Sequence, residues 1–131
     1  MATSAPTITG VDFVTVSATD FDASVHFYGE VLGLPLTARY GSRDGAEFEA
    51  GGLTLSVIRS EDMGMTFTLN THPIAFHVED IEAARAELEG RGVEFAADTM
   101  DTGVCYMAFF RDPAGNALML HHRYAPRTPL G

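Results

Sequence analysis

Cysteine and basic residues are scarce in this 131-residue chain, and each shortage excludes something. Cys105 is the single cysteine, so no internal disulfide can form and we expect a reducing, cytoplasmic compartment. Lysine and arginine number 8 against 18 acidic residues, which gives a formal net charge of −10. This acidity disfavours nucleic acid and anionic membranes as partners. It would favour a cationic small molecule, although solubility is the commoner reason for such a charge.

Long hydrophobic runs and several familiar catalytic signatures are also missing. No window has the apolar length of a membrane-spanning helix. Met1–Gly10 lacks the basic and apolar segments of a signal peptide, so we expect a short arm there and a similar tail at 125–131. No glycine-rich phosphate loop, Ser-His-Asp spacing or cysteine pair occurs. The 46% of hydrophobic residues fits a single compact domain over residues 1–131.

The predicted elements repeat once along the chain. Asp20 and Asp80, 60 residues apart, each follow an apolar strand and precede a helix with an apolar stripe, as helix N-caps do. Glycine ends both helices, and three strands follow each. We therefore expect an α+β fold of two tandem βαβββ modules, at about 9–60 and 72–124, with a linker at about 61–71. Neither module could bury its sheet alone, so their curved mixed sheets should enclose a shared cavity.

The pattern of apolar residues and turns sets the bounds of these elements. In the first module it predicts a helix at about 21–32 and strands at 11–18, 36–40, 46–50 and 53–59. In the second it predicts a helix between Asp80 and Gly90 and strands at 73–78, 93–96, 104–110 and 117–122.

Alternation along the strands separates a helix-packed face from an inward face. Purely apolar sets, such as Val14 with Val16 and Leu118 with Leu120, indicate the helix-packed face. The inward face then carries the candidate ligand-binding residues. These are Phe13, Thr15, Thr54, Ser56, His77, Met107, Phe109, Met119 and His121. They predict an apolar cavity with a few polar groups, which is the usual composition of a small-molecule site.

The most distinctive motif is the turn Phe110-Arg111-Asp112-Pro113-Ala114-Gly115-Asn116, where proline and glycine favour a reversal between two strands. With Phe27-Tyr28, Leu32-Gly33-Leu34 and the duplicated element order, it resembles the glyoxalase / bleomycin-resistance / extradiol dioxygenase group, also called the vicinal oxygen chelate superfamily. The resemblance covers about Thr9 to Tyr124. It implies the fold and leaves the activity open, because the group includes lyases, dioxygenases, thiol transferases and non-catalytic drug-binding proteins.

The resemblance also implies where a metal would be held. Metalloenzymes of the group bind a divalent ion through His and Glu side chains on paired strands. Carried over by position, these ligands fall on Phe13, Thr54, Pro73 and Met119. Such an ion needs imidazole or carboxylate donors, and none of these four side chains supplies one. We therefore expect no metal at these positions and no cofactor.

Histidines keep a second arrangement open. His72 lies one residue before an expected ligand position, but a shift by one residue turns a side chain to the other face. His77 and His121 point toward the cavity by alternation. They could contact a ligand, hold a displaced Zn, Ni, Fe or Mn ion, or bond nearby backbone and carboxylate groups. His26 and His122 are expected to be structural or solvated, with His122 facing outward.

Three hypotheses of function follow. The first is non-catalytic binding of a small organic molecule, antibiotic-like or cationic, as in the antibiotic-sequestering members that the chain resembles. The alternative is a divalent-metal-dependent lyase or dioxygenase with displaced ligands. The third is an interaction module, which would have no accessible cavity. Glu47 and Glu49 could face a cationic ligand, but an exposed rim is favoured for them. The resemblance further implies a homodimer.

Overall fold

The computed structural model describes residues 5–128, and its two sheets repeat one topology. The first sheet consists of β1 (Phe13–Ala18), β2 (Leu36–Arg39), β3 (Gly45–Ala50) and β4 (Leu53–Arg59). The second consists of β5 (Ile74–His77), β6 (Met100–Asp101), β7 (Cys105–Arg111) and β8 (Ala117–Arg123). The strand orders are β1-β4-β3-β2 and β5-β8-β7-β6, and the first two strands of each order are parallel. The two βαβββ modules predicted from the sequence are thus confirmed.

The helices begin where the sequence places their caps. They are α1 (Phe21–His26), continued by the π-helical η1 (Phe27–Val31), the 3-10 segment η2 (Ser60–Met63), and α2 (Ile81–Gly90). The Asp20 carboxylate accepts a hydrogen bond from the Ala23 N–H at 3.1 Å, and the Asp80 carboxylate accepts one from the Ala83 N–H at 3.0 Å. In the described part of the chain, no helix has the length and apolar character to cross a membrane.

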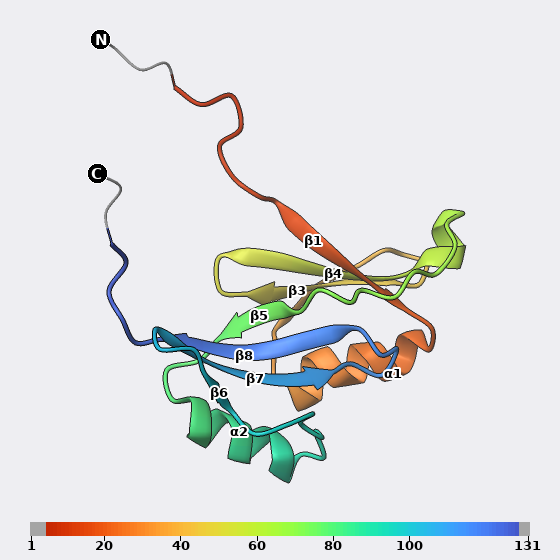
Figure 1. Cartoon of the computed structure of the whole chain (residues 1–131). Coiled ribbons are helices and arrows are strands. Elements are labelled where there is room, and N and C mark those ends of the chain that lie inside the picture. The colour runs from red at the N-terminus through yellow and green to blue at the C-terminus, as the bar shows by residue number, and fades with distance from the viewer. Residues whose placement is uncertain (1–4, 129–131) are drawn as a thin grey trace.

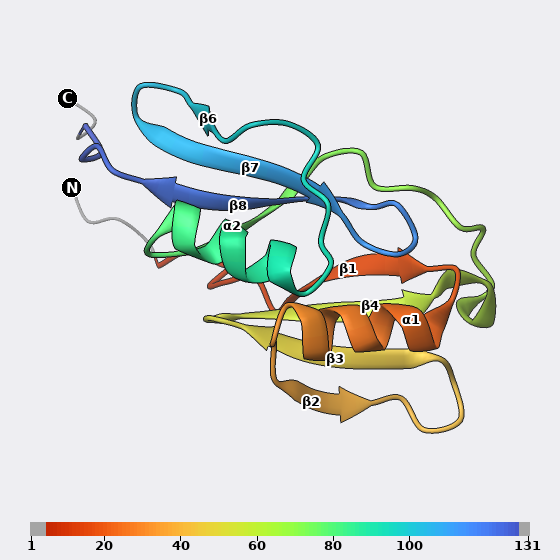
Figure 2. The same cartoon turned by 90° about the horizontal axis from the view of Figure 1, so that it is seen from below.

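Both helices cover the same side of the sheets. Figure 2 shows α1 lying over β3 and β4, and α2 lying along β8. The side chains between helices and sheets form one core that runs through both modules. It includes Val16, Tyr28, Phe48, Leu55 and Val57 from the first module, and Leu88, Phe110, Leu118 and Leu120 from the second. The helix-packed faces expected from alternation are therefore the buried ones.

The Asp112 turn joins the two modules. Asp112 is 5% exposed, and its carboxylate accepts hydrogen bonds from the Tyr28 hydroxyl at 2.6 Å and from the Asn116 amide at 2.8 Å. The same amide donates to the Ser17 carbonyl at 2.8 Å, while the Asn116 side-chain oxygen accepts from the Asn70 N–H at 3.0 Å. The motif that resembles the family thus also fixes how the second module docks on the first.

The predicted helix at 21–32 is α-helical in its first half only. From Phe27 onward it is wound more widely, and the Leu32 N–H donates to the Phe27 carbonyl at 2.9 Å, five residues back. This winding places Phe27 against Phe110, with ring centroids 6.3 Å apart, and Tyr28 against Asp112. The irregularity lies at the contact between modules, which local sequence does not encode.

The predicted strand at 93–96 is wrong. The Val93 N–H donates to the Leu88 carbonyl at the end of α2, at 3.0 Å. This bond holds the start of the 93–96 segment against the helix, so the segment does not pair with β7 as a strand. Only the Ala96 N–H reaches β7, at 2.9 Å from the Phe109 carbonyl. The edge strand β6 forms a few residues later and spans two residues.

The sheets lie side by side and do not close into a barrel (Figure 1). The predicted linker at 61–71 begins within η2 and continues without regular structure. Residues 5–12 and 124–128 contain no helix or strand and lead away from the sheets at one end of the molecule (Figure 1). Positions 1–4 of the expected arm and 129–131 of the expected tail lie outside the described residues.

Candidate functional site

In the first module, the predicted ligand-binding residues share the sheet face turned away from α1. The parallel pairing of β1 with β4 sets Phe13 beside Thr54 and Thr15 beside Ser56. Phe13 is 58% exposed, whereas Ser56 is 2% exposed. Because the intervening residues of both strands pack toward the helix, these four side chains form one continuous strip on the open face.

A tyrosine that alternation had not selected covers the polar end of this strip. The Tyr40 hydroxyl donates to the Glu47 carboxylate at 2.7 Å and lies 2.9 Å from the Ser56 hydroxyl. Burial raises the pKa of Tyr40, the Ser56 contact opposes this, and the Glu47 carboxylate adds to it. The pairing of β3 with β4 also sets Glu49 beside Thr54. Both glutamates are half-buried on the open face, so the exposed rim expected for them is wrong.

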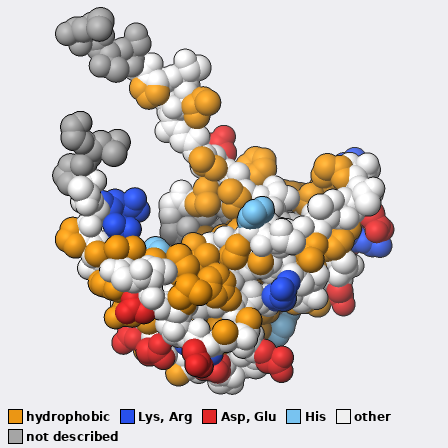
Figure 3. Space-filling view, viewed as in Figure 1, with side chains coloured by type: hydrophobic (Ala, Val, Ile, Leu, Met, Phe, Trp, Pro, Cys, Tyr) orange, Lys and Arg blue, Asp and Glu red, His pale blue; other side chains and the backbone are white. Residues whose placement is uncertain are grey.

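In the second module, the open face is more apolar. Antiparallel pairing of β7 with β8 sets Phe109 beside Met119 and Met107 beside His121. The parallel pairing of β5 with β8 then sets His77 on the other side of His121. Hydrophobic side chains gather over β7 and β8 on this face of the molecule (Figure 3). The structure thus brings together the four predicted residues of these two strands, with His77 at the edge.

The four positions that the resemblance assigns to metal ligands do not fit a divalent ion. Phe13 and Thr54 are strand neighbours, Met119 lies beside Ala75, and Pro73 precedes β5. A phenyl ring, a hydroxyl, a thioether and a pyrrolidine ring offer no imidazole or carboxylate donor. These four side chains therefore do not form a site for such an ion.

His77 has polar partners other than His121. Its Nε2 lies 2.9 Å from a carboxylate oxygen of Glu79, and this hydrogen bond lowers the pKa of Glu79. Its ring lies 5.9 Å from that of His122, centroid to centroid. The Nδ1 of His122 is 2.9 Å from the Val78 carbonyl oxygen, and His122 is half-buried rather than turned out to solvent. A carboxylate partner at the sheet margin was one of the roles left open for His77.

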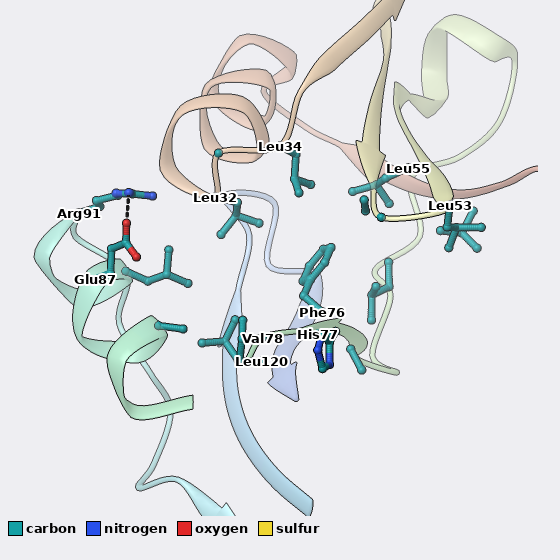
Figure 4. A pocket seen from close by; sticks show the side chains of 18 residues that line it. Leu32, Leu34, Leu53, Leu55, Phe76, His77, Val78, Glu87, Arg91 and Leu120 are labelled. Atoms are coloured by element: carbon teal, nitrogen blue, oxygen red, sulfur yellow. Dashed lines mark hydrogen bonds and ion pairs between the residues drawn. The ribbon is translucent and has the colours of Figure 1, made fainter. Parts of the chain in front are cut away.

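A cavity of about 660 Å³ lies between the two modules, on the helix side of the sheets. Apolar side chains from both modules line it, and Leu32 and Leu34 lie opposite Phe76, Val78 and Leu120 (Figure 4). Leu120 was expected on the helix-packed face and is 3% exposed, whereas Leu32, Leu34, Phe76 and Val78 are half-buried beside the cavity. Of the nine predicted ligand-binding residues, His77 is the one that lines this space.

Three ionisable side chains line the cavity. Besides His77, they are Glu87 and Arg91, which form an ion pair one turn apart on and just beyond α2 (Figure 4). Arg91 also donates to the Val31 carbonyl at 2.8 Å, across the junction between the modules. Since Arg91 compensates the charge of Glu87, the cavity presents an apolar body with a paired charge at its edge.

No curated protein matches this sequence, whereas solved structures match the fold closely. The antibiotic-binding protein TnmS3 from Streptomyces sp. CB03234 is 23% identical, with a TM-score of 0.76 over 91% of this chain and 99% of that one. A lactoylglutathione lyase from Agrobacterium tumefaciens is 19% identical, with a TM-score of 0.72 over 88% of this chain and 95% of that one.

A glyoxalase/bleomycin resistance protein/dioxygenase from Nocardioides is 23% identical, with a TM-score of 0.74 over 99% of this chain and 93% of that one. At these identities the matches show the fold alone. The family assignment comes from the sequence, because residues 10–120 match the family model of this superfamily. The chain belongs to the Glyoxalase/Bleomycin resistance protein/Dioxygenase superfamily.

Proposed function

We propose that this protein binds a small organic molecule without chemical conversion, in the cavity between its two modules. The observation that carries the proposal is the size and lining of that cavity. Its volume of about 660 Å³ falls within the range of drug-sized ligand sites, and its walls are apolar with a few ionisable groups. The antibiotic-binding protein among the structural neighbours supports the same class of function.

The charge of the chain supports a ligand with a cationic group. The net charge of −10 raises the local concentration of cations around the molecule. At the cavity itself, His77 can accept a hydrogen bond from an amine, while the leucine and phenylalanine side chains bury the apolar body of the ligand. An amphipathic amine, as found in many antibiotics, has this combination.

The proposal needs no metal ion. The donor set at Phe13, Thr54, Pro73 and Met119 supports binding without one, because these side chains cannot hold an ion that would activate a substrate. The second candidate, a lyase or dioxygenase with displaced metal ligands, would instead require an ion near the cavity and a chemical product.

A thermal-shift screen of amphipathic amines and antibiotics, run in the presence of a chelator, tests the proposal. A ligand at a hundredfold over its Kd should stabilise the protein by about 2.7 kcal/mol. Ala84 lines the cavity, so Ala84→Leu should fill part of it and reduce the shift. Ala86→Leu is the matched control, because Ala86 lies on the exposed side of the same helix.

Two outcomes would contradict the proposal. A stabilisation by the organic ligand that appears only when a divalent ion is also present, beyond the effect of the ion alone, would favour the metal-dependent alternative. A shift that survives Ala84→Leu but is lost in Thr15→Arg would place the ligand on the open sheet face instead, with the residues predicted from the sequence.

We also propose that the protein forms a homodimer through the open sheet faces. Phe13 is 58% exposed and Met100 is 49% exposed on strands of these faces, although both are large apolar side chains. A second copy of the chain placed on these faces would remove both side chains from water, which is favourable.

A further inference from the structure

We propose that His77, Glu79 and His122 form a binding site for a borderline divalent cation such as Zn²⁺ or Ni²⁺. Among the residues that the structure describes, these three are the one group whose ligand atoms, one from each side chain, all lie within 4.8 Å of one another. Two imidazoles and a carboxylate are a donor set that such ions accept. The site is distinct from the four positions that the resemblance assigns to a metal.

The pairing of β5 with β8 builds the site. These strands are parallel with His77 opposite His121, and the Val78 N–H donates to the His121 carbonyl at 3.0 Å. The segment that follows β5 therefore continues beside β8. Glu79, two residues after His77, returns to the same side of the backbone and meets its imidazole. His122 approaches the pair from β8.

The hydrogen bonds of the site suit ligation. A carbonyl oxygen only accepts, so the 2.9 Å contact between His122 and the Val78 carbonyl places the proton on Nδ1 and leaves the lone pair on Nε2. Metal-binding histidines in proteins commonly donate their second ring N–H in this way, which fixes the ring and its tautomer. His77 and Glu79 already face each other at 2.9 Å.

The site has room to adjust to an ion. The side chains of His77 and Glu79 are 63% and 89% exposed, so they can turn from each other toward a shared ion at about 2.0–2.2 Å. Three protein ligands would leave further coordination positions open. Because His77 also lines the cavity between the modules, an ion held here would lie at the edge of that cavity.

This inference goes beyond the proposed function and is tested apart from it. Tag-free, chelator-stripped protein is titrated with Zn²⁺ and Ni²⁺ in competition with a chromophoric chelator, with no organic ligand present. We expect one equivalent to bind. His77→Ala, Glu79→Gln and His122→Ala should each weaken binding by at least about tenfold, since even outer contacts of metal ligands are worth that much.

Matched histidines on the same protein provide the controls. His26→Ala and His72→Ala remove exposed imidazoles elsewhere and should leave the affinity unchanged. His121→Ala separates this site from a pairing of His77 with its strand neighbour, and it should also retain the ion. Absence of binding, or loss in His121→Ala with retention in His122→Ala, would overturn the proposal. His77 and Glu79 are exposed, so their variants report on the site even if His122→Ala fails to fold.

Discussion

Ionisation of the buried Tyr28 hydroxyl would place a second negative charge beside the carboxylate of Asp112. Tyr28 is fully buried, and its hydroxyl donates to the buried carboxylate of Asp112 at 2.6 Å. Burial raises the pKa of Tyr28 first, and the charge of Asp112 raises it further. The phenol therefore stays protonated in the folded protein at pH values where an exposed tyrosine ionises.

This pKa difference predicts an alkaline loss of stability that Tyr28→Phe should remove. Because the folded pKa of Tyr28 is raised, its contribution is complete below the unfolded value of 10.0 and falls as the pH rises above it. The slope from one such group is at most about 1.4 kcal/mol per pH unit. Urea unfolding between pH 8 and 11 should show a shallower decline for Tyr28→Phe, at a cost of about 1 kcal/mol at neutral pH for the lost hydrogen bond.

Tyr106→Phe is the control for this measurement, because Tyr106 is half-buried on β7 and lies away from Asp112. It should keep the wild-type decline above pH 10. Equal slopes for the wild-type protein and Tyr28→Phe would show that Tyr28 ionises normally in the folded state.

At the scale of single residues, the sequence predicted the sheet face of a side chain better than it predicted which side chains that residue contacts. Alternation placed His77 and His121 side by side, as the strand register confirms. It missed the approach of His122 and Glu79 to His77. β5 is an edge strand that ends at His77, so a side chain there is free to turn around the edge, and strict alternation fails at that point. The sequence did contain a signal for this cluster. His121 and His122 are adjacent on β8, and His77 and Glu79 lie two residues apart at the end of β5, the strand that pairs with β8.

At the scale of elements, the β2–β3 hairpin depends on a glycine that the sequence pattern marks only as a turn. Gly45 begins β3, and a Cβ built on it would lie 2.0 Å from the Tyr40 ring. Tyr40 in turn bonds Glu47 and Ser56 on the open face of the sheet. The glycine therefore allows the aromatic ring to cross directly over the backbone.

Gly45→Ala should destabilise the protein by about 1–3 kcal/mol, because the ring must leave its position or the strand must shift. Gly52→Ala is the matched control. No atom lies within 4 Å of the Cβ it would add, so its effect should be neutral or stabilising by up to about 1 kcal/mol. Urea unfolding measures both variants. Equal stabilities would mean that the Tyr40 ring moves aside without cost.

The elements that the sequence predicted correctly are those with local signals. Asp20 and Asp80 both cap helices, and the glycine-containing turn after Asp112 reverses the chain between β7 and β8. The errors occur where long-range contacts override local pattern. The π-helical turn of η1 forms against Phe110 and Asp112, and the 93–96 segment remains attached to the end of α2. Tertiary packing decides both outcomes.

At the scale of the whole molecule, the duplication predicted two modules but not the space between them. Alternation assigns side chains to faces within one sheet, whereas the cavity arises from how two sheets and two helices meet. That meeting is fixed by contacts such as Tyr28 to Asp112, which are 84 residues apart in sequence. Residues such as Val14 and Leu120 were therefore correctly predicted as helix-facing, and they line a cavity for the same reason.

The open sheet faces would form the interface of the proposed homodimer. Light scattering of the purified protein should give twice the 14.1 kDa of one chain if the proposed homodimer forms. Phe13→Glu should dissociate it, because burying a phenylalanine contributes about 1.5–3 kcal/mol and a two-fold interface contains it twice. That corresponds to a dimer Kd at least about a hundredfold weaker.

Met65→Glu is the control, because Met65 is 52% exposed but lies in the segment between the modules and belongs to no strand of either sheet. It should leave the dimer intact. A wild-type mass of 14.1 kDa at micromolar concentration would contradict the homodimer, and equal dissociation by both variants would place the interface elsewhere. Because Phe13 and Thr15 are neighbours on β1, a dimer through this face would also bring the candidate residues of one copy against those of the other.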